Sequence, residues 1–212
     1  MPMGYNMPMN VRGFTLVEMV VCIAIFAMMT ALLVAKYGTF NQSVLLTDLA
    51  YDTAITVRTA QTYGLGVQST GGSNPFNYAY GVEFCANVNG CGTIGSVHLT
   101  NNFFVLFSDV KNDKFFDAGN IQQSIYTLTR GAIVSGICVT TDCTAPDGNL
   151  RLDITFKRPN PDAIICSTAK CENSTTHVPY PPYPFAGIFI KGTDGSTREV
   201  TIRNTGQISV QE

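Results

Sequence analysis

Hydrophobic positions are most concentrated near the N-terminus, where residues 14–35 form a run of 22 residues whose only charged member is Glu18. As a helix this run is about 33 Å long, close to the thickness of a bilayer's hydrocarbon core. A secretory signal peptide is the alternative, but its apolar core usually spans only about 7–15 residues before a small-x-small cleavage site. The candidate exit residues Ala31 and Ala35 have large side chains two positions earlier, which do not suit such a site. The pattern therefore predicts a retained transmembrane helix over residues 14–35.

The helical pattern continues beyond the apolar run. Small or apolar residues recur there at spacings of three and four, as one face of an amphipathic helix requires. These residues are Leu46, Leu49, Ala50, Thr53, Ala54, Val57 and Ala60. Gly64 and Gly66 predict the end of the helix. We therefore expect one helix from Phe14 to Tyr63, in which residues 36–63 are an amphipathic continuation that packs on the rest of the chain.

After Gly66 the pattern changes to short runs rich in β-branched and aromatic residues, separated by Gly, Asn, Asp and Pro. Strands are predicted near residues 78–84, 103–107, 124–128, 133–139, 150–156, 163–166, 186–191, 199–203 and 208–210. The runs at 150–156 and 199–203 alternate as half-buried strands do, whereas the run at 103–107 is continuous and indicates deeper burial. The sequence thus predicts an α+β fold, in which the long N-terminal helix, half membrane-spanning and half amphipathic, packs on an antiparallel β-sheet or sandwich formed by residues 64–212.

Composition and charge narrow the range of functions. Hydrophobic residues make up 45% and charged residues 13% of the 212 residues, a balance that excludes a disordered chain. The net charge of −2 creates no overall attraction to nucleic acid or to an anionic membrane. With two histidines and no common hydrolase, metalloprotease or phosphate-binding motif, we expect neither an enzyme nor a cofactor. The G-x-G-x-x-G pattern at residues 90–95 is followed by strand-like sequence rather than a helix, so we interpret it as a glycine-rich loop.

The seven cysteines bear on the compartment. Cys22 lies within the apolar run, and the other six form three close pairs: Cys85 and Cys91, Cys138 and Cys143, and Cys166 and Cys171. Sequence alone does not choose among the possible connectivities, but sequential pairing is the simplest. We therefore expect three disulfides that fix local loops, which supports export to an oxidising compartment. Zinc is the alternative, but the C-x5-C and C-x4-C spacings differ from the C-x2-C pairs of zinc sites, and we assign no metal ligand.

Glu18 requires a functional explanation, because a carboxylate inside a membrane helix costs roughly 2.5–3.5 kcal/mol. It lies four residues into the apolar run, about 6 Å from the run's boundary. Arg12 is the only nearby cation in the intact chain. A cut between Gly13 and Phe14 would remove that cation and create an α-amine that is largely protonated at neutral pH. The new amine would be four residues from Glu18, on the same helix face.

The N-terminal segment RGFTLVE at residues 12–18, followed by the apolar run, resembles the class III signal of type IV prepilins and type II secretion pseudopilins. The resemblance implies that residues 1–13 are a leader peptide, which a membrane aspartyl peptidase, the prepilin peptidase, removes after Gly13. It also implies that Phe14 becomes a methylated N-terminus and that Glu18 helps the subunit to join a growing filament. The half-embedded helical spine of these pilins matches the helix that the pattern predicts.

The segment FSDVKNDKFFDAGN at residues 107–120 contains three aspartates at four-residue spacing: Asp109, Asp113 and Asp117. Oxygen-rich loops can hold Ca²⁺, although an EF-hand is excluded because lysines occupy its third and sixth positions. The segment resembles more loosely the acidic loop of the GspH/FimT branch of minor pilins, with Lys114 in place of the loop glycine and Asn120 in place of the final acid. Two interpretations stay open, namely bound calcium and, preferred, a loop folded on its own Asx turns.

We expect a structural subunit, a minor pilin or pseudopilin of a type IV pilus or a type II secretion pseudopilus, rather than an enzyme. The resemblance implies three kinds of partner: the prepilin peptidase, other pilin or pseudopilin subunits, and an inner-membrane assembly platform. It implies a single pass through the inner (cytoplasmic) membrane before assembly, with the globular domain outside the cytoplasm, and a place in the pilus or pseudopilus afterwards. The alternative function is ligand binding at the filament tip, as an adhesin or a DNA-uptake receptor. DNA is the less expected ligand, because Arg198 and Arg203 are offset by Glu199 and Glu212.

Overall fold

The computed structural model describes residues 13–66, 78–140, 143, 145–146, 148, 150–167 and 182–211. The chain divides into two compact units, Met1–Asn41 and Gln42–Glu212. The first unit contains the beginning of the helix α1 (Leu16–Leu65), and the second contains the rest of α1 and all the strands that the structure describes.

The helix α1 begins where a polar side chain caps it. Thr15 precedes the first helical residue, and its hydroxyl oxygen accepts a hydrogen bond from the backbone N–H of Glu18 at 3.3 Å. The backbone N–H of Met19 donates to the carbonyl oxygen of Thr15 at 3.1 Å. A Thr followed three residues later by Glu is the capping-box pattern of helix N-termini. The local sequence therefore explains why α1 begins at Leu16, two residues later than predicted.

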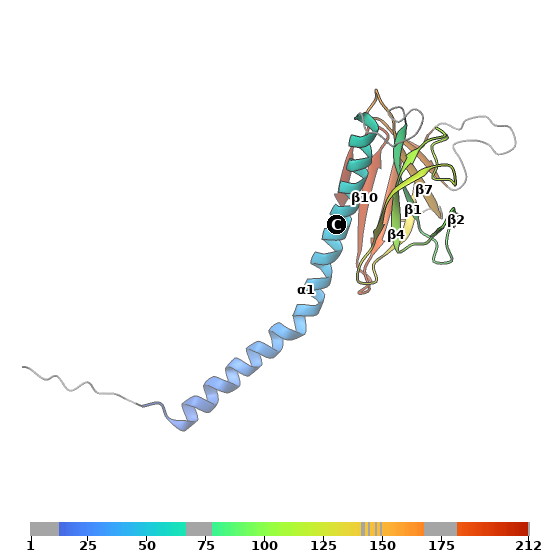
Figure 1. Ribbon diagram of the computed structural model, residues 1–212. Helices are drawn as coiled ribbons and strands as arrows, with labels where there is room; N and C mark the ends of the chain where they lie inside the picture. Colours follow the sequence, from blue (N-terminus) through green and yellow to red (C-terminus); the bar gives the residue numbers. More distant parts are fainter. Residues whose placement is uncertain are drawn as a thin grey trace, which may run out of the picture. The chain divides into compact units, whose positions relative to one another are not determined.

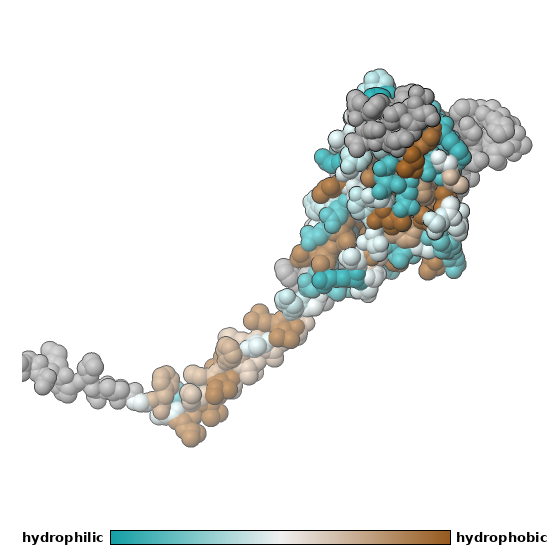
Figure 2. Space-filling view, in the orientation of Figure 1, coloured by the Kyte–Doolittle hydropathy of each residue, from teal (hydrophilic) through white to brown (hydrophobic). Residues whose placement is uncertain are grey.

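Up to Gly38 the side chains of α1 are exposed, although nearly all of them are apolar. Every residue from Gly13 to Gly38 is exposed, including Phe26 at 73% and Leu33 at 73%. Figure 2 shows this part of the helix as a predominantly brown, hydrophobic surface. Among the described residues α1 is the one helix long and apolar enough to cross a membrane. A surface of this kind is stable in lipid or against other apolar helices and not in water, which agrees with the predicted membrane anchor.

In the second unit one face of α1 is buried, as the spacing of its small residues predicted. Six of the seven predicted residues are buried and Leu49 is partly buried against the same cluster. The buried ones are Leu46, Ala50, Thr53, Ala54, Val57 and Ala60. On the neighbouring turn, Arg198 donates hydrogen bonds to the hydroxyls of Thr47 and Ser43, each at 3.1 Å, which joins α1 to β10. Figure 1 shows this part of α1 lying beside β10.

The helix ends at Leu65 rather than at the predicted Tyr63, because Gly64 serves close packing rather than termination. A Cβ atom at Gly64 would lie 2.4 Å from the carbonyl oxygen of Phe156 on a neighbouring strand. The carbonyl oxygen of Gly64 also accepts a hydrogen bond from the backbone N–H of Arg158 at 3.1 Å. Gly66 closes the last turn by donating to the carbonyl oxygen of Thr62 at 2.8 Å.

The strands form two larger antiparallel sheets and one hairpin. The five-stranded sheet has the order β5-β4-β1-β7-β8, with β1 Ala79–Cys85, β4 Phe103–Asp109, β5 Ile121–Thr127, β7 Arg151–Phe156 and β8 Ala163–Ser167. The four-stranded sheet has the order β11-β10-β9-β6, with β6 Ile133–Cys138, β9 Phe185–Lys191, β10 Thr197–Arg203 and β11 Ile208–Gln211. The hairpin pairs β2 Gly92–Ile94 with β3 Val97–Leu99. The predicted α+β fold, a long helix on antiparallel sheets, is confirmed.

Apolar side chains form two separate cores. The larger core joins the buried face of α1 to one face of each large sheet, with Phe84, Ile154 and Ile188 among its fully buried members. The smaller core lies on the opposite face of the five-stranded sheet, where the hairpin supplies Leu99 and the segment after β4 supplies Phe116. The five-stranded sheet is therefore covered on both faces.

Each of the nine predicted strands overlaps an observed one, but two predictions about the β-rich region were wrong in detail. The run at 150–156 was expected to be half-buried, whereas four of the six residues of β7 face no solvent and none is exposed. The apolar residues of β7 lie in the larger core, and Asp153 and Thr155 on its opposite face are buried rather than exposed to solvent. Residues 90–95, interpreted as a glycine-rich loop, contain the three-residue strand β2, which is too short to show a strand-length pattern, and the strand-like sequence after them contains β3.

Candidate functional site

The predicted processing site lies immediately before α1. Gly13 and Phe14 are both exposed and lie outside the helix, and a Cβ atom at Gly13 would meet nothing within 4 Å. The side chain of Phe14 is 75% exposed. A peptidase needs non-helical, accessible backbone, and the bond between these two residues meets both conditions. The rest of the predicted leader, residues 1–12, lies outside the described residues.

Glu18 occupies the third helical position of α1, where a carboxylate has a physical role of its own. Its backbone N–H is capped by Thr15, and an acidic side chain in the first turn interacts favourably with the positive end of the helix dipole. Its side chain is exposed and projects from an otherwise apolar surface. The arrangement places one carboxylate a single turn from the chain end that cleavage after Gly13 would create.

Comparison with known proteins agrees with this geometry. Residues 8–34 match the family described as the prokaryotic N-terminal methylation motif. The chain carries a type IV prepilin-type signal. The match covers the processing site, Glu18 and most of the apolar run, so this signal supports a type IV pilin-like or pseudopilin subunit that the prepilin peptidase processes and that assembles with other pilins. No curated protein and no solved structure matches the chain. The GspH/FimT resemblance of the globular part accordingly stays a prediction.

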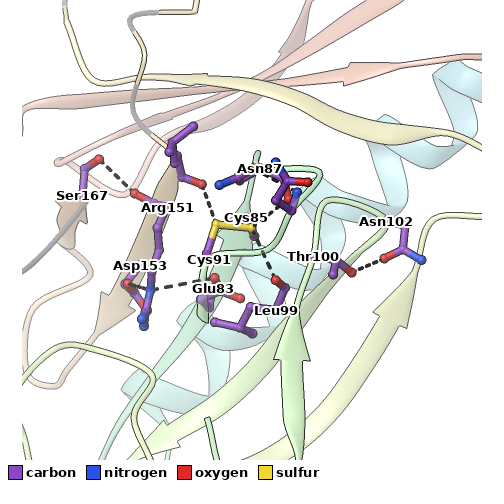
Figure 3. The surroundings of a disulfide bond; sticks show 12 residues. Glu83, Cys85, Asn87, Cys91, Leu99, Thr100, Asn102, Arg151, Asp153 and Ser167 are labelled. Carbon is purple, nitrogen blue, oxygen red and sulfur yellow. Dashed lines mark hydrogen bonds and ion pairs between the residues drawn. A yellow bond between two sulfur atoms is a disulfide. The ribbon is translucent and has the colours of Figure 1, made fainter. Parts of the chain in front are cut away.

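Two disulfides of the β-rich unit join predicted partners. Cys85 and Cys91 are bonded, with Cα atoms 5.8 Å apart, and tie the end of β1 to the hairpin (Figure 3). Cys138 and Cys143 are bonded, with Cα atoms 5.7 Å apart, at the end of β6. Cys22 is a free and exposed cysteine. The third predicted pair stays a prediction, because Cys171 lies outside the described residues.

The acidic segment after β4 is folded on hydrogen bonds from its own backbone. The carboxylate of Asp109 accepts the backbone N–H groups of Asp113, at 3.2 Å, and of Lys114, at 2.8 Å. Asp113 accepts the N–H of the residue two positions later at 3.3 Å, and Asp117 does the same at 2.8 Å, as in Asx turns. Asp117 also forms an ion pair with Lys111 at 2.5 Å. In the described part of the chain no group of three His, Cys, Asp or Glu residues is placed to hold a metal ion.

Burial raises the pKa of Asp109 to about 6, from an ordinary value of 3.8, against the backbone hydrogen bonds that lower it. Asp109 is fully buried. Its carboxylate accepts hydrogen bonds from two backbone N–H groups, and these bonds favour the ionised form. Desolvation outweighs those bonds, and the nearby negative charge of Asp113 adds a smaller effect that also raises the pKa of Asp109.

A buried ionic cluster that the sequence analysis did not single out lies beneath this segment. Arg151 and Asp153 are two residues apart on β7, so their side chains project from the same face of the sheet. The guanidinium of Arg151 donates to both carboxylate oxygens of Asp153, at 2.9 and 3.0 Å. Glu83 is the cross-strand partner of Asp153 on β1, and one of its oxygens lies 3.8 Å from Nε of Arg151. Figure 3 shows the three side chains together beside the disulfide of β1.

The two acids of this cluster share a single cation. Glu83 is 0% exposed and Asp153 2% exposed, and neither carboxylate oxygen of Glu83 has a hydrogen-bond partner. Burial, with a smaller contribution from the charge of Asp153, raises the pKa of Glu83 well above its ordinary range, and Arg151 only partly opposes this. Burial also raises the pKa of Asp153, against the effect of Arg151. The cluster is therefore most stable with Arg151 paired to ionised Asp153 and with Glu83 protonated.

Part of this cluster had a signal in the sequence. The alternation of residues 150–156 places Arg151 and Asp153 on one strand face, and an acid within the apolar run at 78–84 is unusual. The register between β1 and β7 brings Glu83 next to Asp153. The sequence pattern does not show this register.

Proposed function

We propose that this protein is a minor pilin or pseudopilin, a structural and non-enzymatic subunit that enters a filament through its exposed apolar helix. The observation that carries the proposal is the methylation motif at residues 8–34. The motif overlaps the N-terminal part of α1, whose surface is apolar and exposed. In the second unit the same helix contributes to the core of a β-rich domain, so it can transmit force from a filament to that domain. A GspH-like role at low copy number is the specific form of the proposal.

The proposal includes orientation and partners. Before assembly the helix spans the inner (cytoplasmic) membrane once, with the β-rich unit outside the cytoplasm, where its disulfides form. An inner-membrane assembly platform then moves the processed subunit into the pilus or pseudopilus. The disulfides and the apolar run support this orientation.

The first test is the mass of the mature protein isolated from its own host. We expect a chain that begins at Phe14 and carries one added methyl group. A chain that begins at Met1, or one cut after Ala31 or Ala35, would contradict the proposal.

The second test is filament entry of the Glu18→Ala variant. Removal of a carboxylate from an apolar helix makes membrane insertion easier, and the bond after Gly13 is unchanged, so insertion and cleavage should persist. The amine of Phe14, in the same or a neighbouring subunit, would lose its partner in an apolar setting, at a cost of roughly 3–5 kcal/mol. We therefore expect processed variant to accumulate in the membrane and to be depleted from sheared filaments. Asp48→Ala, an exposed acid further along the same helix, is the matched control and should enter normally. Equal entry of the Glu18→Ala variant would show another role for Glu18.

The alternative, a tip subunit that binds a ligand such as DNA, predicts different behaviour. A DNA receptor should bind with an affinity that falls steeply as salt rises, whereas a filament subunit should show no such binding. The two C-terminal arginines support the filament subunit, because both have intramolecular partners. Arg198 is bonded to α1, and Arg203 lies 5.6 Å from the centre of the Phe185 ring. A salt titration of DNA binding by the full chain in detergent distinguishes the two functions.

A further inference from the structure

The segment of residues 110–120, which follows β4, is fastened to the ionic cluster through a single residue. The backbone N–H of Phe116 donates to a carboxylate oxygen of Asp153 at 3.0 Å. The carbonyl oxygen of Phe116 accepts a hydrogen bond from the guanidinium of Arg151 at 2.6 Å. The ring of Phe116 packs on Phe107 of β4, with ring centres 5.3 Å apart. The segment thus covers the cluster, and the cluster in turn holds the segment.

Glu83 is the member of the cluster that makes no hydrogen bond, although it is fully buried. Ionised Glu83 beside ionised Asp153 would leave one uncompensated negative charge under the segment, since Arg151 is the only cation of the cluster. An uncompensated buried charge is costly unless water reaches it.

We propose that residues 110–120 form a proton-linked cover, which stays docked while Glu83 holds a proton and opens to admit water when Glu83 ionises. The proposal is independent of the filament function, because it concerns the interior of the β-rich unit alone.

The segment is the part of the surrounding structure that can move. The hairpin β2–β3, which covers the same face, is tied to β1 by the disulfide of Cys85 and Cys91. Residues 110–120 have no covalent tie, and apart from the packing of Phe116 they are held by hydrogen bonds and one ion pair. Lys114 also adopts a positive φ angle of 72°, which residues other than Gly, Asn and Asp tolerate poorly. Opening would relieve that backbone strain.

Charged and titratable groups on this side of the five-stranded sheet come from several elements. β7 contributes Arg151 and Asp153, β4 contributes Asp109, and the hairpin contributes His98, which is exposed and packs on Gly90. The covering segment contributes Lys111, Asp113, Lys114 and Asp117, of which Lys111 and Asp117 are paired with each other. Arg151 is the one cation within 4 Å of the Glu83 carboxylate among the described residues, and Arg151 and Asp153 are the charges that act on the pKa of Glu83.

Hydrogen exchange of the full chain in detergent micelles, followed by mass spectrometry from pH 5.5 to 9, tests the proposal. After correction for intrinsic exchange rates, the protection of residues 110–120 should fall by up to about tenfold per pH unit in the range where Glu83 ionises, as expected for one linked proton. The β10 strand should keep its protection, because opening is local. The Glu83→Gln variant should hold the segment closed and make its protection independent of pH above the pKa of Asp109, which burial raises to about 6.

The matched control is Glu199→Gln. Glu199 also has a buried carboxylate oxygen without a hydrogen bond, but it lies on β10 of the other sheet. Its replacement should leave the pH dependence of residues 110–120 unchanged. Identical pH dependence in wild type and Glu83→Gln, or parallel loss of protection in β10, would overturn the proposal.

A fluorescent reporter gives an independent measurement if Glu83→Gln alters folding. The chain contains no tryptophan, so Phe115→Trp, at a half-buried position of the segment, supplies the only one. Its emission should shift to longer wavelength as pH rises, and addition of acid should reverse the shift. Emission that is constant across the range would overturn the proposal.

Discussion

Replacement of Arg151 by methionine should be strongly destabilising. Methionine keeps an unbranched apolar stem but removes the hydrogen bonds that the guanidinium donates to Asp153 and to the carbonyl of Phe116. It leaves Glu83 and Asp153, paired residues of adjacent strands, without a cation. Loss of one partner from a buried ion pair costs roughly 3–5 kcal/mol. At about 2–4 °C per kcal/mol for a chain of this size, the Tm should fall by roughly 6–20 °C.

The pH dependence of this loss distinguishes charge from packing. Arg151 lowers the pKa of both acids, so its removal raises both values further. The folded variant then keeps its protons to higher pH than folded wild type does, and the difference in the free energy of unfolding should grow as pH rises. The added substitution Glu83→Gln should recover part of the loss at high pH.

Thermal unfolding of the full chain in micelles, followed by circular dichroism at pH 5, 7 and 8.5, measures these effects. The control is Arg130→Met, which removes one exposed positive charge and should change stability by no more than about 0.5 kcal/mol. A loss below about 1 kcal/mol at pH 8.5, or a loss that does not change with pH, would refute the electrostatic account.

Three further predictions concern stability. Gly64→Ala should cost about 1–3 kcal/mol in urea unfolding, because its Cβ would lie 2.4 Å from a carbonyl oxygen of β7. Gly38→Ala, on the same helix with nothing within 4 Å, should cost nothing, and equal effects would refute the packing argument. Replacement of both Cys85 and Cys91 by serine should lower the free energy of unfolding by roughly 2 kcal/mol, the loop-entropy value for a separation of 6 residues, and an unchanged midpoint would contradict this. Because the pKa of Asp109 is raised to about 6, its contribution to the free energy of unfolding should fall as pH rises from about 4 to 6 and then stay constant. The Asp109→Asn variant should lack that fall, and parallel pH profiles would exclude Asp109 as its source.

Much of the fold could be predicted from the sequence, because the deciding signals are local. The apolar run and the small face of the second part of α1 each depend on residues within one or two helical turns. Nine of the observed strands of the β-rich unit followed from their composition and from the turn residues between them, and the short hairpin β2–β3 did not. The motif that carries the proposed function is likewise contiguous, so it could be recognised without any structure.

The tertiary structure decided what depends on distant residues meeting. Gly64 looked like a helix stop, but its lack of a side chain serves the approach of β7. The alternation of β7 looked like half-burial, but its second face is buried, and Phe116 of residues 110–120 is hydrogen-bonded to Asp153 and Arg151 there. The cluster of Glu83, Arg151 and Asp153 depends on the register between β1 and β7, and a shift of one residue would turn the partners to opposite faces. A sequence pattern specifies which faces are apolar, whereas strand register and the choice of covering segments arise only when the whole chain packs.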